Sequence, residues 1–272
     1  MRALVVGSIT RDTNIFDGIA QHTFGGTALY AARTYLRFGI DVTLISRLAA
    51  ADEPLIAAEL PGVRLVAQTS PVTTTFENSY GANDERTQRV PAVAAPIAYE
   101  AAYFDDIDWL HLGPLHPLDL EKGWLNAHRG KPAGLDLQGF ARRIDGEHVV
   151  PDIDPRVVDL LPRLNWLKAS RIEWQTLQAH LHISPLERPA RNAIETLVTD
   201  GADGGILLRE GQRDVHWSAA PPVEGCDPTG AGDVFFAAYL YHRTAKLADA
   251  GSAATGAARI TSRFLLQRRD QR

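Results

Sequence analysis

The length, composition and charge of the chain already exclude several classes of protein. It has 272 residues, of which 45% are hydrophobic, so it can bury a sizeable core as one large domain or two small ones. Its net charge is −5, and no long block of Lys or Arg offers a surface for nucleic acid. No run approaches the ~20 apolar residues that cross a bilayer. The single cysteine, Cys226, rules out an internal disulfide. We therefore expect a cytoplasmic protein that binds neither nucleic acid nor a membrane.

Short β-prone apolar runs alternate along the chain with longer segments of helical periodicity. Residues 3–6 predict a strand, residues 27–38 place apolar side chains on one face of a helix, and residues 42–46 return as a strand. Further strands are expected at residues 63–66, 109–112, 133–137, 164–168 and 196–199, an edge hairpin at 205–209 and 214–217, and final helices at 230–243 and 246–267. This alternation predicts an α/β fold with a central, mainly parallel sheet flanked by helices.

One region breaks the alternation. Residues 73–80 are β-prone but polar, and residues 86–90 return as a second strand. This hairpin is too polar for the centre of a parallel sheet. It is either a surface flap or, paired with residues 12–16 and 22–24, a small lid over a pocket. We predict a single domain over residues 1–272, with a β lid made from segments of about 11–25 and 72–91.

The most informative motif is the heptapeptide Asp227-Pro228-Thr229-Gly230-Ala231-Gly232-Asp233, which leads into an apolar helical segment. Its small residues let backbone N–H groups turn toward one point at the start of a helix, where the helix dipole attracts an anion. Asp233 is poorly placed to bind that anion. It is better suited to accept a proton from an attacking hydroxyl. The structural alternative is an ordinary glycine-rich loop with an acidic residue in the first helical turn.

With several earlier segments, this motif resembles the ribokinase-like (PfkB) family of carbohydrate kinases. The family signature Asp-x-Thr-Gly-Ala-Gly-Asp is matched in full at residues 227–233. The other segments follow the family order: Gly7-Ser8 with Asp12, Gly25-Gly26, the strand end Leu135-Asp136-Leu137-Gln138, Lys168-Ala169-Ser170 with Glu173, and Thr199-Asp200-Gly201 with Gly204. The resemblance implies a ribokinase-like α/β fold and phosphoryl transfer from ATP, with Mg²⁺, to a hydroxyl of a small carbohydrate or polyol.

The resemblance also implies roles for individual residues. Asp233 is the expected base, and the expected anion hole is formed by the backbone amides of Gly230, Ala231, Gly232 and Asp233. The nucleotide is expected at Thr199, Gly201, Gly204, Asp227, Thr229, Lys168 and Ser170, and the metal at Glu173. The acceptor is expected at Asp12, Gly25, Gly26, Glu77, Asn78, Asp136 and Gln138. Structural alternatives exist for three of these: a plain strand connection at Thr199, first-turn dipole pairing for Glu173, and a turn-forming role for Asp12.

Two positions depart from the general family pattern. Ser170 stands in place of the expected Asn, and Tyr30 stands where many of these sugar kinases have an Asn that touches substrate. Serine after Lys-Ala is usual in the myo-inositol kinase branch, which the chain also resembles at residues 75–77, 135–138 and 161–163. That similarity implies a cyclic polyol as acceptor.

Other interpretations stay open at this stage. The acceptor can instead be a sugar or a nucleoside, and a non-catalytic ligand-binding protein on the same fold is an alternative of another class. The lid either pairs with a second subunit, as a homodimer, or faces solvent. Arg268, Arg269 and Arg272 are predicted to form a solvated basic end.

Overall fold

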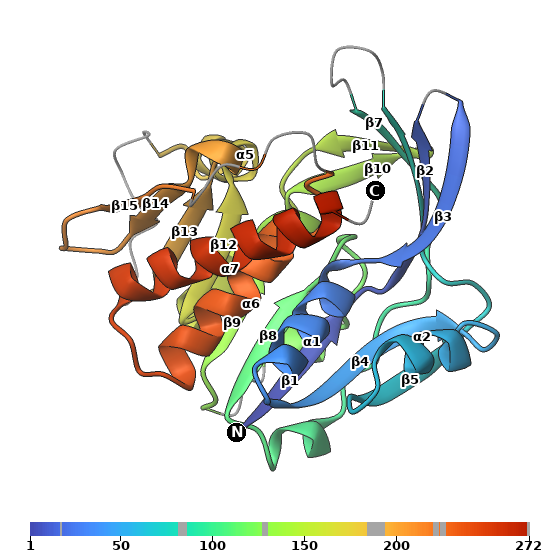
Figure 1. The fold of residues 1–272 in the computed structure, drawn as a ribbon, viewed down its shortest axis with the longest axis horizontal. Coiled ribbons are helices and arrows are strands. Elements are labelled where there is room, and N and C mark those ends of the chain that lie inside the picture. The colour runs from blue at the N-terminus through green and yellow to red at the C-terminus, as the bar shows by residue number, and fades with distance from the viewer. Residues whose placement is uncertain are drawn as a thin grey trace.

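The computed structural model describes residues 1–16, 18–80, 86–126, 130–183, 194–219, 223 and 227–270, arranged as two sheets with flanking helices (Figure 1). The larger sheet has nine strands in the order β15-β14-β13-β12-β9-β8-β1-β4-β5. These strands are β1 (Arg2–Gly7), β4 (Asp41–Ala49), β5 (Arg64–Ser70), β8 (Trp109–Gly113), β9 (Ala133–Asp136), β12 (Trp166–Ser170), β13 (Glu195–Thr199), β14 (Gly205–Leu208) and β15 (Val215–Trp217). Neighbours from β5 to β13 are parallel, and β14 and β15 add an antiparallel hairpin at one edge. The predicted α/β fold with a mainly parallel sheet is confirmed.

Helices cover both faces of this sheet, and the side chains of β1 are therefore buried on both sides. Ala3 and Val5 belong to one core with residues of α1 (Thr27–Arg37), α2 (Glu53–Glu59), α6 (Ala231–Thr244) and α7 (Ala250–Asp270). Leu4 and Val6 belong to a second core with residues of α3 (Lys122–Asn126), α4 (Arg156–Leu160) and α5 (Arg171–His180). Four short 3-10 turns are also present among the described residues: η1 (Ala101–Phe104), η2 (Leu137–Phe140), η3 (Leu161–Arg163) and η4 (Gly201–Asp203).

The last two helices pack together through small side chains. The buried face of α7 carries Ala250, Ala253, Ala254, Ala257 and Ala258, whose spacing repeats at three and four residues. The helix begins at Ala250, four residues later than the sequence predicts. Leu247 has a φ of 50°, a left-handed conformation that interrupts the preceding turn.

The second sheet has six strands in the order β10-β11-β7-β6-β2-β3. They are β2 (Thr10–Phe16), β3 (Ile19–Gly25), β6 (Thr75–Tyr80), β7 (Arg86–Ala92), β10 (Arg142–Asp145) and β11 (His148–Pro151). As expected for a lid, β6 pairs with β2, and β3 pairs with β2 on its other side. The β10–β11 hairpin was not predicted, since strands of four residues are too short to show a clear period.

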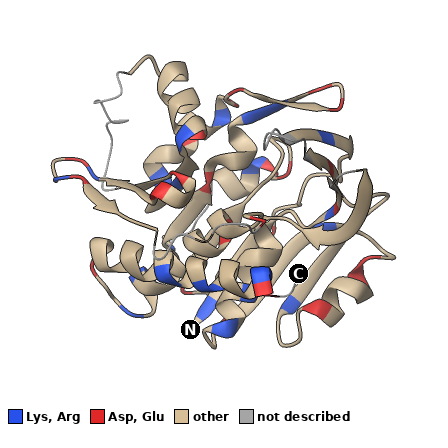
Figure 2. Cartoon of the chain, turned by 45° about the horizontal axis from the view of Figure 1, so that its top comes forward, with Lys and Arg blue, Asp and Glu red and all other residues tan. Residues whose placement is uncertain are grey.

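The position of the second sheet follows from the connection between β1 and β2. Only Ser8 and Ile9 separate the two strands, so the second sheet begins at the carboxyl end of the central strands. Charged residues of both signs are interspersed over the face shown in Figure 2, without a broad patch of one sign among the described residues in that view. Within the described ranges, no helix has the length and apolar character that crossing a membrane requires.

Candidate active site

A cavity of about 580 Å³ lies between the carboxyl ends of the central strands and the second sheet. It brings together nine of the predicted site residues: Asp12, Gly26, Asn78, Gln138, Lys168, Thr229, Gly230, Gly232 and Asp233. Tyr30, which departs from the family pattern, also lines it. The cavity is also lined by residues that sequence reasoning missed as site residues, namely Thr10, Thr27, Phe76, Gln88, Leu115, Arg142 and Pro228. The 227–233 motif and the second sheet therefore face each other across one cavity.

The loop before α6 needs glycine for two reasons. Gly230 caps the helix with a φ of 83°, and a Cβ added there would lie 2.7 Å from the ring of Tyr30. The Ala231 amide donates to the carbonyl of Pro228 at 2.9 Å, so it is already engaged. Within the described part of the chain, the amides of Gly232 and Asp233 have no hydrogen-bond acceptor. The predicted anion hole is thus smaller than expected, because Ala231 is committed to the turn.

Asp233 lies in the first turn of α6, where it is partly buried and lines the cavity. Desolvation and, second, the nearby Asp136 carboxylate raise the pKa of its carboxyl group to about 7. The Lys168 ammonium and the Thr27 hydroxyl act in the opposite direction on this pKa. A carboxyl group that titrates near neutral pH, with its proton-accepting oxygens in a cavity, is suited to act as a general base.

A buried ion pair lies beneath the loop. Lys168 Nζ is 3.0 Å from Asp136 Oδ2, and both side chains are almost completely inaccessible to solvent. Although desolvation lowers the pKa of Lys168, the nearby carboxylates of Asp136, Glu173 and Asp233 outweigh it and raise the pKa above its usual value. A Cβ on Gly232 would lie 2.9 Å from Nζ, which places the ammonium directly against the loop. Lys168 therefore stays charged and adds a cation beside the two free amides.

Asp136 has a role that differs from the predicted one. It is not among the described residues that line the cavity. Its carboxylate instead accepts from the Gln138 amide at 3.1 Å and holds Lys168. Asp136 thus acts through Lys168 and through the placement of Gln138, a wall residue of the cavity.

Glycines 25 and 26 make room for the opposite wall. A Cβ on Gly25 would lie 2.1 Å from Asp12 Oδ2, so the glycine leaves space for the buried Asp12 carboxylate. Gly26 has a φ of 97°, and a Cβ there would lie 2.3 Å from the Ser8 carbonyl oxygen. Gly25 itself does not line the cavity among the described residues; it shapes the wall by accommodating Asp12.

Side-chain amides connect three strands of the second sheet. Asn78 Nδ2 donates to Asn14 Oδ1 at 2.9 Å, and Gln88 Nε2 donates to Asn78 Oδ1 at 2.9 Å. Glu77, the neighbour of Asn78, belongs to the other face of the strand, where its carboxylate pairs with Arg89 at 3.3 Å. Glu77 is not among the described residues that line the cavity, because side chains alternate along a strand, so its contact with the acceptor stays a prediction. Gln88 joins the cavity wall because the register between β6 and β7 sets it opposite Asn78, which a sequence pattern does not show.

The segments expected to hold the donor lie at the ends of β12 and β13. Thr199 Oγ1 donates to the Ala169 carbonyl at 3.3 Å, and η4 follows with Gly201 at a φ of 56°. Gly204 has a φ of 88°, and a Cβ there would lie 2.1 Å from the Trp217 carbonyl oxygen. Close packing of the edge hairpin therefore explains Gly204 without any ligand, so its nucleotide contact stays a prediction.

Ser170 and Glu173 form a capping box at the start of α5. The Ser170 amide donates to Glu173 Oε2 at 2.7 Å, and the Glu173 amide donates to Ser170 Oγ at 3.3 Å. Glu173 is still close enough to Lys168 and Asp233 to raise the pKa of both. No group of three or more His, Cys, Asp or Glu side chains with metal-binding geometry occurs in the described ranges. A metal at Glu173 would therefore need ligands from the substrate or water.

Arg268 contradicts its prediction as a solvated residue. Its Nη2 donates to Asp227 Oδ2 at 2.8 Å, and its Nη1 donates to the Thr229 carbonyl at 2.5 Å. The guanidinium also lies over the ring of Phe264, 5.6 Å from its centroid. The Asp227 side chain accepts a second bond from the Thr229 amide at 2.9 Å. The end of α7 is thus tied to the loop that carries Asp233, a contact with no signal in the sequence.

Comparisons with known proteins agree with this architecture. Residues 142–263 match the model of the pfkB family of carbohydrate kinases. A pyrophosphate-dependent kinase of the ribokinase family, solved with a pyrophosphate analogue and myo-inositol, superposes with a TM-score of 0.82 at 22% identity, over 97% of this chain and 95% of that one. Arabidopsis thaliana ribokinase with ribose and ATP gives a TM-score of 0.71 at 19% identity, over 97% of this chain and 92% of that one.

A nucleoside kinase from Burkholderia thailandensis, solved with inosine, gives a TM-score of 0.75 at 18% identity and covers 97% of this chain and 90% of that one. No curated protein sequence matches the chain. At these identities the structural likeness shows the fold alone, and the family model matches only residues 142–263. Residues 142–263 therefore match a PfkB-family carbohydrate kinase domain, and the chain has a ribokinase-like fold.

Proposed function

We propose that the chain is a kinase that transfers a phosphoryl group from ATP to a hydroxyl of a small polyol or sugar. The observation that carries this proposal is the position of Asp233: a partly buried carboxyl group in the first turn of α6, with a pKa of about 7, that lines a cavity whose other wall carries Asp12. A merely structural first-turn aspartate would have no reason to be held half-ionised at neutral pH inside a cavity lined by polar groups.

The residues divide the chemistry between them. Asp12 and the amides of Asn78 and Gln138 would bind hydroxyl groups of the acceptor, since they offer both donors and acceptors. Asp233 would take the proton of the attacking hydroxyl. The free amides of Gly232 and Asp233, the start of α6 and the Lys168 ammonium would face the negative charge of the phosphoryl group.

ATP and Mg²⁺ are the expected partners on the donor side. Glu173 suits a hydrated Mg²⁺, which usually takes one or two carboxylates together with substrate phosphates. When bound, the ion would neutralise charge on the donor phosphates. Thr199, Gly201 and Asp227 are the proposed contacts of the nucleotide. The single cysteine supports the cytoplasm as the proposed compartment, and the homodimer through the lid stays a prediction.

Pyrophosphate is a second candidate donor. Three of the compared structures, with TM-scores of 0.80 to 0.82, are described as pyrophosphate-dependent, whereas the ribokinases and nucleoside kinases give 0.70 to 0.75. The acceptor side of the proposal is the same for both donors. Among acceptors, myo-inositol is the first candidate because the sequence resembles that branch and because two of these structures are described with myo-inositol or as myo-inositol kinases.

A panel that crosses donors with acceptors tests the proposal. ATP and pyrophosphate, each with Mg²⁺, are offered with myo-inositol, ribose, fructose and inosine, and phosphorylated acceptor is measured by ³¹P NMR. We expect product with a polyol or sugar and with one donor. Preference for inosine would select a nucleoside kinase. Binding of a polyol without product from either donor would contradict catalysis and leave a ligand-binding protein.

A further inference from the structure

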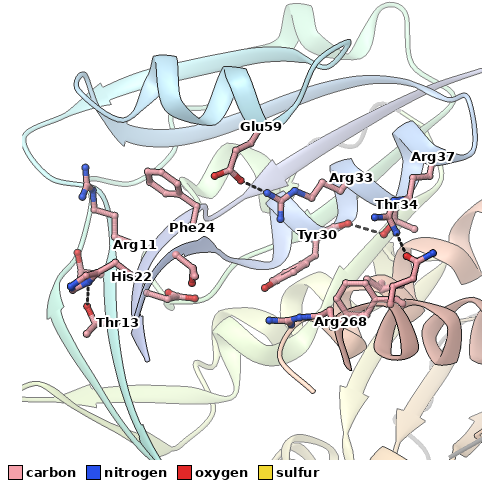
Figure 3. A pocket seen from close by; sticks show the side chains of 16 residues that line it. Arg11, Thr13, His22, Phe24, Tyr30, Arg33, Thr34, Arg37, Glu59 and Arg268 are labelled. Carbon is pink, nitrogen blue, oxygen red and sulfur yellow. Dashed lines mark hydrogen bonds and ion pairs between the residues drawn. The ribbon is translucent and has the colours of Figure 1, made fainter. Parts of the chain in front are cut away.

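A second cavity, of about 790 Å³, adjoins the acceptor cavity and shares Asp12 and Tyr30 with its lining. Figure 3 shows this second cavity. Most of its lining comes from strands β2 and β3, helix α1 and the end of α7, with Glu59 of α2, Thr75 of β6 and Val234 of α6. Figure 3 shows Tyr30, Arg33 and Arg268 on one side of this space and Thr13 and His22 on the other. Its volume is within the usual range for small-molecule sites.

The described lining is rich in hydrogen-bond donors. It holds four arginines, whereas its carboxylates are Asp12 and Glu59. The Tyr30 hydroxyl is a further donor, since burial raises its pKa to about 12 and keeps it protonated. Threonine hydroxyls and His22 complete the polar wall. The chain as a whole carries a charge of −5, so general basicity does not account for this concentration of cations.

The arginines have partners within the chain, but these partners do not occupy all of their N–H donors. Arg11 Nε donates to both oxygens of Asp52 at 2.9 and 2.8 Å. Arg33 pairs with Glu59 through Nη2, and both side chains are about a third exposed, so this pair contributes little by itself. Arg37 reaches only Gln267 Oε1 at 3.4 Å, with no carboxylate partner in the described part of the chain. A guanidinium has five N–H donors, and each of these contacts leaves several of them available.

We infer that this cavity is a second ligand site, separate from the acceptor and donor sites, for a small molecule that carries a phosphate ester. A phosphate offers several acceptor oxygens to guanidinium groups that already project into one space. The rings of Phe24, Tyr30 and Phe264 provide apolar cover for the body of such a ligand. The inference does not depend on the identity of the acceptor or donor of the proposed kinase.

The site is also connected to the catalytic loop. Arg268 lines it and holds Asp227 and Thr229, which lie in the motif that ends at Asp233. A phosphate bound beside Arg268 is therefore expected to alter the loop and to change the turnover of the enzyme.

Isothermal titration with glycerol 3-phosphate tests the site, with glycerol as the uncharged counterpart. The wild type is expected to bind two equivalents of the phosphate, one at the loop of residues 230–233 and one in the second cavity. The double variant Arg33→Gln/Arg37→Gln is expected to weaken the second event by about tenfold or more and to keep the first. Arg259→Gln/Arg263→Gln removes the same two charges from exposed positions on α7 outside the described lining of the cavity and is expected to bind like the wild type.

A gain-of-binding variant protects the test against loss of folding. Glu59→Gln frees Arg33 from its carboxylate and is expected to strengthen the second event several-fold. A wild type with no binding event that the double variant weakens would overturn the inference. A single event that the double variant weakens would support it and would instead count against phosphate binding at the loop of residues 230–233. Loss of a dimer in the double variant, without a change in phosphate affinity, would equally overturn it and would assign the arginines to an interface between copies of the chain.

Discussion

The two walls of the acceptor cavity are built in opposite ways. On the central-sheet side, charged groups lie close together: Asp136 ends β9, Lys168 lies in β12 and Asp233 lies in the first turn of α6. The carboxylates raise the pKa of Lys168, and the Lys168 ammonium lowers that of Asp233. On the second sheet, neutral amides of Asn78 and Gln88 are joined across strands, and the charged pair of Glu77 and Arg89 lies on the other face. The contrast assigns chemistry to the first wall and recognition to the second. Substitutions in the first should change kcat and stability, and those in the second should change KM.

The largest expected effect comes from Asp233→Asn. An amide cannot accept the hydroxyl proton, so kcat should fall by about 100- to 10,000-fold in the assay that uses the preferred acceptor. The same change should stabilise the protein at pH 8. The folded pKa of about 7 lies above the ordinary value of 3.8, so the folded state binds more protons in this interval and stability falls as the pH rises through it. Thermal unfolding at pH 8 measures this gain, and wild-type activity would contradict the mechanism.

Lys168→Met should be the most destabilising of these changes. It leaves the buried Asp136 carboxylate without its cation, which costs about 3–5 kcal/mol in comparable cases. Urea unfolding measures the loss. The double variant Lys168→Met/Asp136→Asn should regain part of the stability, because no buried charge is left unpaired, but it should stay inactive. Full activity in the double variant would exclude Lys168 from the chemistry.

The pH dependence of kcat/KM tests whether Asp233 must be ionised. Below its pKa of about 7 the carboxyl group is protonated in the folded protein, so kcat/KM should fall by about tenfold per pH unit. Above that pH the rate should level off. A profile that is flat from pH 5 to pH 8 would contradict Asp233 as the base.

Arg268→Gln tests the contact between α7 and the catalytic loop. Loss of the two hydrogen bonds to Asp227 and Thr229 should lower kcat by about tenfold, since hydrogen bonds from a charged group contribute about 1.5–3 kcal/mol each before relaxation. Arg269→Gln is the matched control, because that exposed side chain pairs only with the adjacent Asp270 in the described structure. Equal activities of the two variants would show that Arg268 contributes no more to the loop than a solvated residue does.

The smallest effect is expected on the lid. Asn78→Ala removes a neutral amide from the cavity wall and should raise KM for the acceptor by about five- to tenfold, the loss of one net hydrogen bond, with kcat nearly unchanged. Glu77→Ala, one residue away on the other face, should leave KM unchanged. A large fall in kcat for Asn78→Ala would remove the distinction between the two walls.

Much of the central sheet could be predicted because its signals are local. Residues 3–6 form a continuous apolar run, as a strand buried on both faces requires, and the 227–233 motif lies next to its helix in sequence. Ala231 was the exception within that motif, since its amide serves the turn. The face of β6 that carries Glu77 could not be predicted, because a one-residue shift along a strand exchanges the two faces and only the register to β2 and β7 sets which side chains face the cavity.

The sequence by itself determined the fold class, the loop that carries Asp233 and the need for glycine at positions 26 and 230. Backbone conformation and hydrophobic period depend on residues that are neighbours in the chain. Tertiary structure alone decided the ionisation of Asp233, the pairing of Lys168 with Asp136 and the contact of Arg268 with the loop. These depend on burial and on charges that lie tens of residues apart in the chain. Coulombic interaction and desolvation act through space, so their effects appear only once the fold has brought those groups together.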